Sequence, residues 1–142
     1  MKKSNTETNE GKIIPIINRC DILIVEDEPL IRALIGKMIQ NGFPSLKVQS
    51  AKDGLEGLEK VMALKPRIIW TCVKLPRMDG LRLIELIRQD PDLKNIRIIV
   101  STGCYTMVDV IKRVVELGID IFLPKPFKIE EILSAIAACL PQ

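Results

Sequence analysis

The chain has 142 residues, 47% of them hydrophobic, which is enough for the continuous core of one domain and leaves no room for a second. Its formal net charge is +3, and residues 1–19 carry four basic side chains against two acidic ones, so the remaining chain is nearly neutral and shows no footprint for nucleic acid or an anionic membrane. With no secretory signal and no apolar run near the roughly 20 residues of a membrane span, we expect a cytoplasmic protein.

The first segment, residues 1–18, is polar and then briefly apolar (IIPII), which predicts a flexible tail ahead of one domain over residues 19–142. From Asp21 onward, strands and helices are predicted in alternation. Short apolar runs typical of buried strands occur at residues 22–25, 68–73, 96–102 and 121–123, and the more polar segment 47–51 predicts an outer strand. Apolar residues at helical spacing predict helices at 29–41, 54–65, 80–89, 108–117 and 129–140.

This alternation predicts an α/β fold, in which helices cover both faces of a five-stranded parallel sheet. The apolar stripe of each helix is expected to pack into the core. In the fourth helix this interpretation assigns the core to Val108, Ile111, Val114 and Val115. Ligands of such sheets bind at the carboxyl ends of the strands. The residues found there are Glu26, Asp27, Cys72, Thr102 and Lys125.

The cysteines and the absence of histidine restrict the chemistry further. The four cysteines form no C-x-x-C pair, so we expect buried or reactive thiols rather than a disulfide framework or an ordinary zinc site. Without histidine, the usual general base near neutral pH is missing, which argues against Ser-His and Cys-His hydrolases.

Four motifs in order carry a resemblance to a known family: ILIVEDEP at 22–29, PRIIWTCVKLPRMDG at 66–80, IIVSTG at 98–103 and LPKPF at 123–127. On these motifs the chain resembles, from about Asp21 to Leu140, a response-regulator receiver domain (CheY-like) of two-component signalling. The resemblance implies a flavodoxin-like (βα)5 fold with strand order 2-1-3-4-5 and a place in a phosphorelay.

In that family an aspartate at the end of the third strand accepts a phosphoryl group, while acidic residues after the first strand hold Mg²⁺. The resemblance assigns the Mg²⁺ ligands to Glu26 and Asp27, and the contacts to phosphoryl oxygens to Thr102 and Lys125. Phe122 takes the place of the aromatic residue that reports the switch. The Lys125-Pro126 bond matches one that is typically cis in the family.

Cys72 stands where the family has its acceptor aspartate, so ordinary aspartyl phosphorylation at this position is excluded. Asp79 cannot replace it, because Asp79 matches the Asp-Gly of the following loop. A soft thiol is a poor ligand for Mg²⁺, so the resemblance implies a weakened Mg²⁺ site. The two acids disfavour the thiolate and Lys125 favours it, so the sequence does not give the direction in which the thiol pKa departs from ~8.5.

We therefore expect a non-enzymatic, stand-alone interaction module of a phosphorelay, in which Cys72 packs as a small apolar side chain. The expected partner is a histidine kinase or a downstream effector, with no direct contact to nucleic acid or membrane. The resemblance also implies a homodimer face on the fourth helix, fifth strand and fifth helix. Candidate contact residues on the fourth helix are Lys112, Arg113 and Glu116.

Two alternatives remain at this stage. In the first, Cys72 is an oxidant-sensing thiol, with Cys104 as a partner because it lies two residues beyond Thr102 on the neighbouring strand. In the second, the chain is a conventional phospho-receiver whose Cys72 was introduced by engineering. A cysteinyl phosphate is also chemically conceivable, because cysteine is a capable nucleophile.

Overall fold

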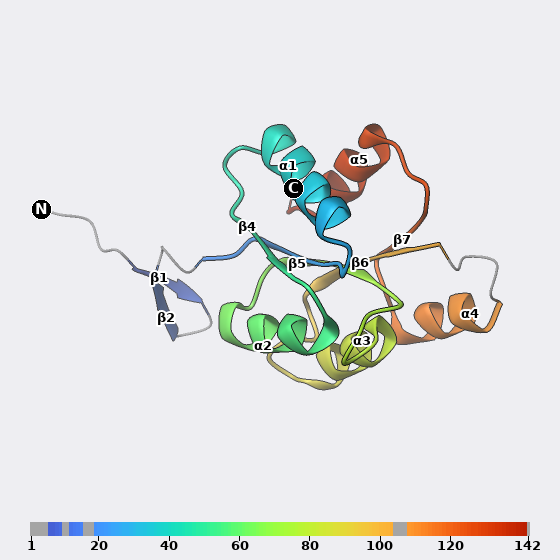
Figure 1. Ribbon diagram of the computed structural model, residues 1–142. Coiled ribbons are helices and arrows are strands. Elements are labelled where there is room, and N and C mark those ends of the chain that lie inside the picture. Colours follow the sequence, from blue (N-terminus) through green and yellow to red (C-terminus); the bar gives the residue numbers. More distant parts are fainter. Residues whose placement is uncertain (1–5, 10–11, 16–18, 104–107, 142) are drawn as a thin grey trace, which may run out of the picture.

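The computed structural model describes residues 6–9, 12–15, 19–103 and 108–141 and confirms the predicted parallel sheet (Figure 1). Its five strands lie in the order β4-β3-β5-β6-β7, and every neighbouring pair is parallel. Counted within this sheet, the order is 2-1-3-4-5, as the family resemblance implied. The bounds are β3 (Ile22–Val25), β4 (Val48–Ala51), β5 (Ile68–Cys72), β6 (Arg97–Thr102) and β7 (Ile121–Pro124).

Helices cover the sheet in two layers (Figure 1). One face carries α1 (Pro29–Gly42) and α5 (Ile129–Cys139), and the other carries α2 (Gly54–Leu64), α3 (Gly80–Gln89) and α4 (Val108–Leu117). Because successive strand residues point to opposite faces, each strand contributes side chains to two separate core clusters. On β5, for example, Ile69 joins the cluster under α2 and α3, whereas Trp70 joins the cluster under α1 and α5.

Two aspartates fix where the helices of one layer begin. The Asp53 carboxylate accepts a hydrogen bond from the backbone N–H of Glu56 at 2.8 Å, and Asp79 accepts one from Arg82 at 2.9 Å. Each carboxylate satisfies an N–H group that the first helical turn leaves without an intrahelical partner. These caps set the ends of the loops that follow β4 and β5.

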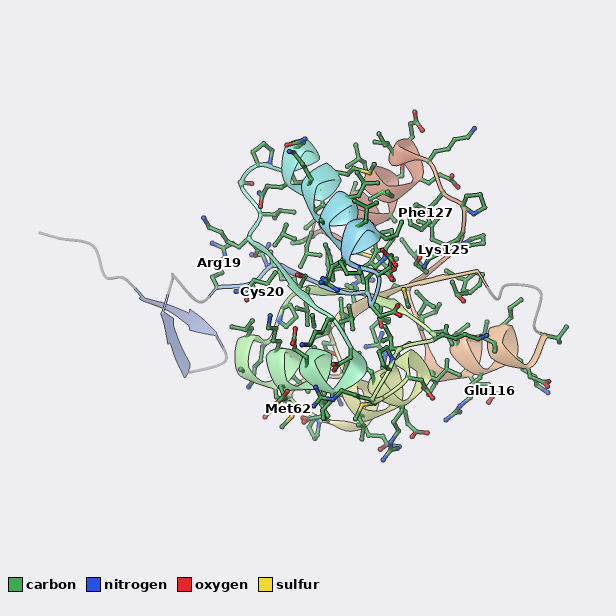
Figure 2. The ribbon with its side chains drawn as sticks, in the orientation of Figure 1. Arg19, Cys20, Met62, Glu116, Lys125 and Phe127 are labelled. Atoms are coloured by element: carbon green, nitrogen blue, oxygen red, sulfur yellow. The ribbon has the colours of Figure 1, made fainter. Side chains whose placement is uncertain are left out.

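In α1 and α4, fewer of the apolar residues are buried than the sequence predicted. In α4 only Val114 is buried, whereas Val108 and Val115 are 75% and 69% exposed, so their assignment to the core is wrong. The reason is that α4 lies at the outer end of its layer, where α3 covers it from one side (Figure 1). In α1, Leu30 and Leu34 are likewise exposed. Met62 on α2 and Glu116 on α4 point away from the sheet (Figure 2).

Ahead of the domain, strands β1 (Thr6–Asn9) and β2 (Lys12–Pro15) pair with each other in antiparallel register. The sequence did not predict this pair, which forms a separate two-stranded sheet. In the part of the chain that the structure describes, no helix combines the length and the apolar character that a membrane crossing requires.

Candidate functional site

The predicted site residues meet at the carboxyl edge of the sheet, because parallel strands all end there. Glu26 follows β3, Cys72 and Thr102 are the last residues of β5 and β6, and Lys125 follows β7. Cys72 is paired in register with Ser101 of β6, next to Thr102. The topology thus places four of the five predicted side chains on adjacent strand ends.

Three of these side chains are in direct contact. The Cys72 thiol donates a hydrogen bond to Glu26 Oε1 at 2.9 Å. Lys125 Nζ lies 3.3 Å from the same oxygen and 3.6 Å from Cys72 Sγ. Glu26 is 1% exposed and Cys72 is 4% exposed, whereas Lys125 reaches solvent along part of its length. The site is therefore a buried thiol and carboxylate closed on one side by an ammonium group.

The surroundings of Cys72 favour the neutral thiol. Burial, and then the hydrogen bond and negative charge of Glu26, raise the pKa of Cys72 to about 12, and the opposing effect of Lys125 is smaller. This gives the direction that the sequence left open. At neutral pH the group is a proton donor to Glu26 and a poor nucleophile.

Glu26 and Lys125 form the charged pair of the site. Burial raises the pKa of the Glu26 carboxyl, but hydrogen bonds from Cys72 and the backbone of Glu28, together with Lys125, lower it below its ordinary value. Burial lowers the pKa of Lys125, and the adjacent Cys72 and Glu26 outweigh that effect and raise it. Both groups are therefore ionised near neutral pH, and their charges cancel inside the pocket.

The other predicted site residues take different positions. Asp27 is exposed, unlike its buried neighbour Glu26. Thr102 is buried, and its carbonyl oxygen accepts a hydrogen bond from the backbone N–H of Lys125 at 2.9 Å, which holds the loop after β7 against β6. Phe122 packs in the cluster on the α2–α4 face. Cys104, the predicted redox partner, lies outside the described residues.

The donor set fits Mg²⁺ poorly. Among the residues that the structure describes, no group of three or more His, Cys, Asp or Glu side chains is placed to hold a metal ion. The Glu26 oxygen that faces the pocket is already bonded to a thiol and an ammonium, and a hard cation prefers oxygen ligands over sulfur. Lys125 compensates the charge of the Glu26 carboxylate in this pocket.

Sequence reasoning missed two contributors to this edge. Arg32 of α1 donates to the carbonyl oxygen of Glu26 at 2.8 Å and so anchors the loop that carries the carboxylate. Phe127 packs edge-on against Trp70, with ring centroids 5.5 Å apart, on the face that α1 and α5 cover. Figure 2 shows Phe127 beside Lys125. The only sequence signal for Phe127 was its place at the end of the LPKPF motif, and Arg32 had none.

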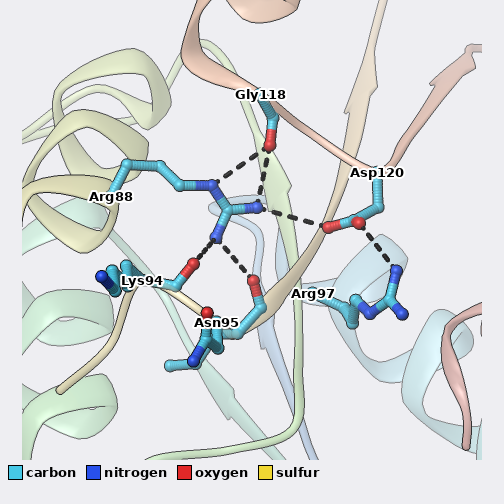
Figure 3. Close-up of a pocket in the computed structure, with 7 residues that line it drawn as sticks. Arg88, Lys94, Asn95, Arg97, Gly118 and Asp120 are labelled. Carbon is cyan, nitrogen blue, oxygen red and sulfur yellow. Dashed lines mark hydrogen bonds and ion pairs between the residues drawn. The ribbon is translucent and has the colours of Figure 1, made fainter. Parts of the chain in front are cut away.

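The opposite edge of the sheet has a pocket of a different kind (Figure 3). Arg88, near the end of α3, donates to the carbonyl oxygens of Lys94, Ile96 and Gly118, at 2.7 to 3.1 Å, and contacts the Asp120 carboxylate at 3.3 Å. These bonds occupy the guanidinium with the protein's own backbone. Arg88 therefore ties α3 to the loops before β6 and β7, which is a structural role.

The buried thiol leads to a test of its surroundings. We expect Cys72 of the folded chain to react slowly with iodoacetamide at pH 8, because its pKa of about 12 leaves little thiolate. Glu26→Gln removes the negative charge that raises this pKa, so the thiolate fraction should rise about tenfold for each unit by which the pKa falls. Peptide mass mapping would measure alkylation cysteine by cysteine.

Cys20 is the internal control, because it is also buried with its pKa raised to about 12 but lies outside this cluster. Its rate should be the same in both proteins. Alkylation of Cys72 in the folded chain as fast as in urea would contradict the assigned environment.

Comparisons with known proteins agree with this geometry. The response regulator receiver domain family matches residues 22–137. Sporulation initiation phosphotransferase F of Bacillus subtilis is 33% identical over 121 residues, which cover 84% of this chain and 93% of that protein. The crystal structure of a signal receiver domain of a DNA-binding response regulator from Colwellia psychrerythraea superposes with a TM-score of 0.80 at 26% identity, covering 87% of this chain and 99% of that one.

Other relatives are longer than this chain. The DNA-binding dual master transcriptional regulator RpaA of Synechocystis is 31% identical over 119 residues, which cover 84% of this chain and 48% of that protein. The chain thus spans about half the length of several curated relatives that it matches. The family match, the strand order and the site at the carboxyl edge agree, and the chain belongs to the response regulator receiver domains of two-component signalling.

Proposed function

We propose that this receiver domain works in two-component signalling as a protein-interaction module that is independent of aspartyl phosphorylation. The observation that carries the proposal is the Cys72 thiol, which stands at the acceptor position as a neutral hydrogen-bond donor to Glu26. A receiver with a phosphoryl switch needs a carboxylate there to attack phosphorus. A protonated thiol in a buried pocket does not supply that nucleophile.

The charge balance of the pocket supports the same proposal. In a phosphorylated receiver, a lysine at the position of Lys125 receives a phosphoryl oxygen. Here Lys125 is already paired with Glu26 at 3.3 Å, so the charge of this buried carboxylate is balanced without Mg²⁺. On this proposal Mg²⁺ binds weakly at best. On the same proposal, Thr102 and Phe122 occupy the family's phosphoryl-contact and switch positions, with no phosphoryl group for Thr102 to bind.

Receiver domains interact with histidine kinases and effectors and are generally not enzymes, so a signalling protein is the partner we propose. Homodimerisation through α4, β7 and α5 is part of the proposal, with Lys112, Arg113 and Glu116 as the candidate contacts on α4. Arg113 already pairs with Glu85 of α3 at 2.6 Å and with Glu116 at 3.6 Å. The exposed Val108 and Val115 add apolar area to that face. We also propose that the protein is cytoplasmic, that it makes no direct contact with nucleic acid, and that its domain begins at residue 19.

The thiol-switch alternative receives less support from this site. Oxidant-sensing cysteines have a low pKa and are accessible, whereas Cys72 is 4% exposed with a pKa of about 12. An engineered origin for Cys72 would change the history of the pocket but not its chemistry in this chain. The interaction module is therefore the function that the geometry favours.

The proposal is tested by incubating the chain with acetyl phosphate and Mg²⁺ and recording the intact mass. We expect no phosphoryl adduct, because the acceptor atom is a buried, protonated sulfur. Sporulation initiation phosphotransferase F, incubated under the same conditions, is the control for the activity of acetyl phosphate. An adduct on this chain that maps to Cys72 would overturn the proposal.

A further inference from the structure

A cavity of about 520 Å³ opens between α1 and α5, next to the acceptor site. The polar end of its lining belongs to the site, with Glu26 and Lys125, and the rest consists of side chains from the two helices and the loop after β7. The apolar lining residues are Ile31, Leu34, Ile35 and Met38 of α1, Ile129 and Ile132 of α5, and Pro126 and Phe127 of the loop between β7 and α5. This volume lies within the range of roughly 300 to 1,000 Å³ that small-molecule sites have, and a mostly apolar wall with a few polar groups is their usual composition.

The mouth of the cavity also presents apolar surface to solvent. Leu34 of α1 is 47% exposed and Ile129 of α5 is 50% exposed, and both line the cavity. Leu30, one turn before Leu34, is 73% exposed. Leu30 and Leu34 are the α1 residues that the helical pattern assigned to the core but that the domain leaves exposed. Contact with an apolar group in the cavity would remove part of this surface from water.

The charges at the cavity select the sign of a ligand. The lining contains three carboxylates, Glu26, Asp27 and Glu28, and one ammonium, Lys125. Lys125 is paired with Glu26, so the unbalanced charge comes from Asp27 and Glu28, which are both exposed. A cationic group at the mouth would lie near two carboxylates, whereas an anionic group would be repelled by them.

We propose that this cavity binds a small organic cation with an apolar body, of the alkyl- or arylammonium class. The apolar body lies between α1 and α5, and the ammonium group lies at the mouth near Asp27 and Glu28. This inference does not depend on the proposed lack of phosphorylation, because the ligand contacts the helices and the rim rather than Cys72.

The domain carries a reporter for occupancy. Trp70 is the only tryptophan of the chain, is fully buried, and packs against Phe127 with an interplanar angle of 77°. Phe127 in turn lines the cavity. A ligand that contacts the Phe127 ring therefore changes the environment next to Trp70, and indole fluorescence follows binding without a label.

The test is a titration of the whole chain with hexylammonium, 1-hexanol and hexanoate, followed by Trp70 fluorescence and by amide chemical shifts. We expect saturable binding of hexylammonium, with shifts confined to α1, α5 and the loop after β7. Hexylammonium should bind about 1.5- to fivefold more tightly than hexanol, the range that exposed ion pairs give, and hexanoate should bind most weakly. Replacing butylammonium by hexylammonium should tighten binding by up to about fourfold per methylene.

Two variants separate the charge from the cavity. Asp27→Asn should reduce the preference for hexylammonium over hexanol toward one, whereas the matched Asp109→Asn, on exposed α4, should leave it unchanged. Leu34→Lys places a cation at the mouth and should abolish hexylammonium binding. Linear, non-saturating shifts, shifts spread over the surface, or equal affinities for the three probes would overturn the proposal, even if the phosphodonor experiment gives the expected result.

Discussion

Cys72→Asp is expected to turn the chain into a phosphoryl acceptor that gains mass from acetyl phosphate in the presence of Mg²⁺. The new carboxylate would stand beside Glu26 at the end of β5, so two acids would share a buried site that now holds one. Their repulsion disfavours the doubly ionised pair, and a divalent cation relieves it. We therefore expect Mg²⁺ affinity to rise by about one order of magnitude or more.

Intact mass spectrometry would measure the phosphoryl adduct, and a Mg²⁺ titration followed by Trp70 fluorescence would measure the metal. Cys72→Asn is the matched control, because it has the shape of Asp without the charge or the nucleophilic oxygen. It should gain neither the adduct nor the metal affinity. If Cys72→Asp also stays unmodified while it folds and binds Mg²⁺, then the retained pocket is not competent and the loss of function extends beyond this one residue.

The fold was predictable because its signals are local and repeated. Four of the five parallel strands contain short apolar runs, β4 being the more polar outer strand, and the alternation of strands with helices restricts the topology to a covered parallel sheet. The extent of burial on each helix was less predictable. Periodicity identifies the apolar face of α4, but it does not show that α4 lies at the outer end of its layer, where Val114 is buried and Val115 is exposed (Figure 1).

The sequence predicted which residues meet at the site, but it did not predict the protonation state of Cys72. The rule that strand ends meet at one edge placed Glu26, Cys72 and Lys125 together, and they are in contact. The direction in which the Cys72 pKa shifts depends on burial and on the distances to Glu26, which raises it, and to Lys125, which lowers it. The spacing of residues along the sequence does not give these distances or the degree of burial. The cavity between α1 and α5 was not predicted, because two helices distant in sequence form its apolar wall, although residues of the ILIVEDEP and LPKPF motifs also line it.

Gly80→Ala is expected to destabilise the domain by about 3 kcal/mol or more, the upper range for overpacking a rigid site. A Cβ on Gly80 would lie 1.8 Å from the carbonyl oxygen of Cys72 and 3.0 Å from the Cα of Val73. Both are backbone atoms that a rotamer change cannot move. The Gly80 N–H also donates to the carbonyl of Val73 at 2.7 Å, so separating the two segments would break that bond.

Urea unfolding followed by Trp70 fluorescence and circular dichroism would measure this cost. Gly36→Ala in α1 is the matched control, because its Cβ would meet only Ile24 Cδ1 at 3.6 Å, an ordinary contact. That variant should be neutral or more stable by up to about 1 kcal/mol, since alanine favours the helix. A Gly80→Ala cost below about 1 kcal/mol would mean that the β5–α3 loop can move away from the strand end. Because that strand end carries Cys72, the same result would mean that the position of Cys72 is not held by the close approach of α3.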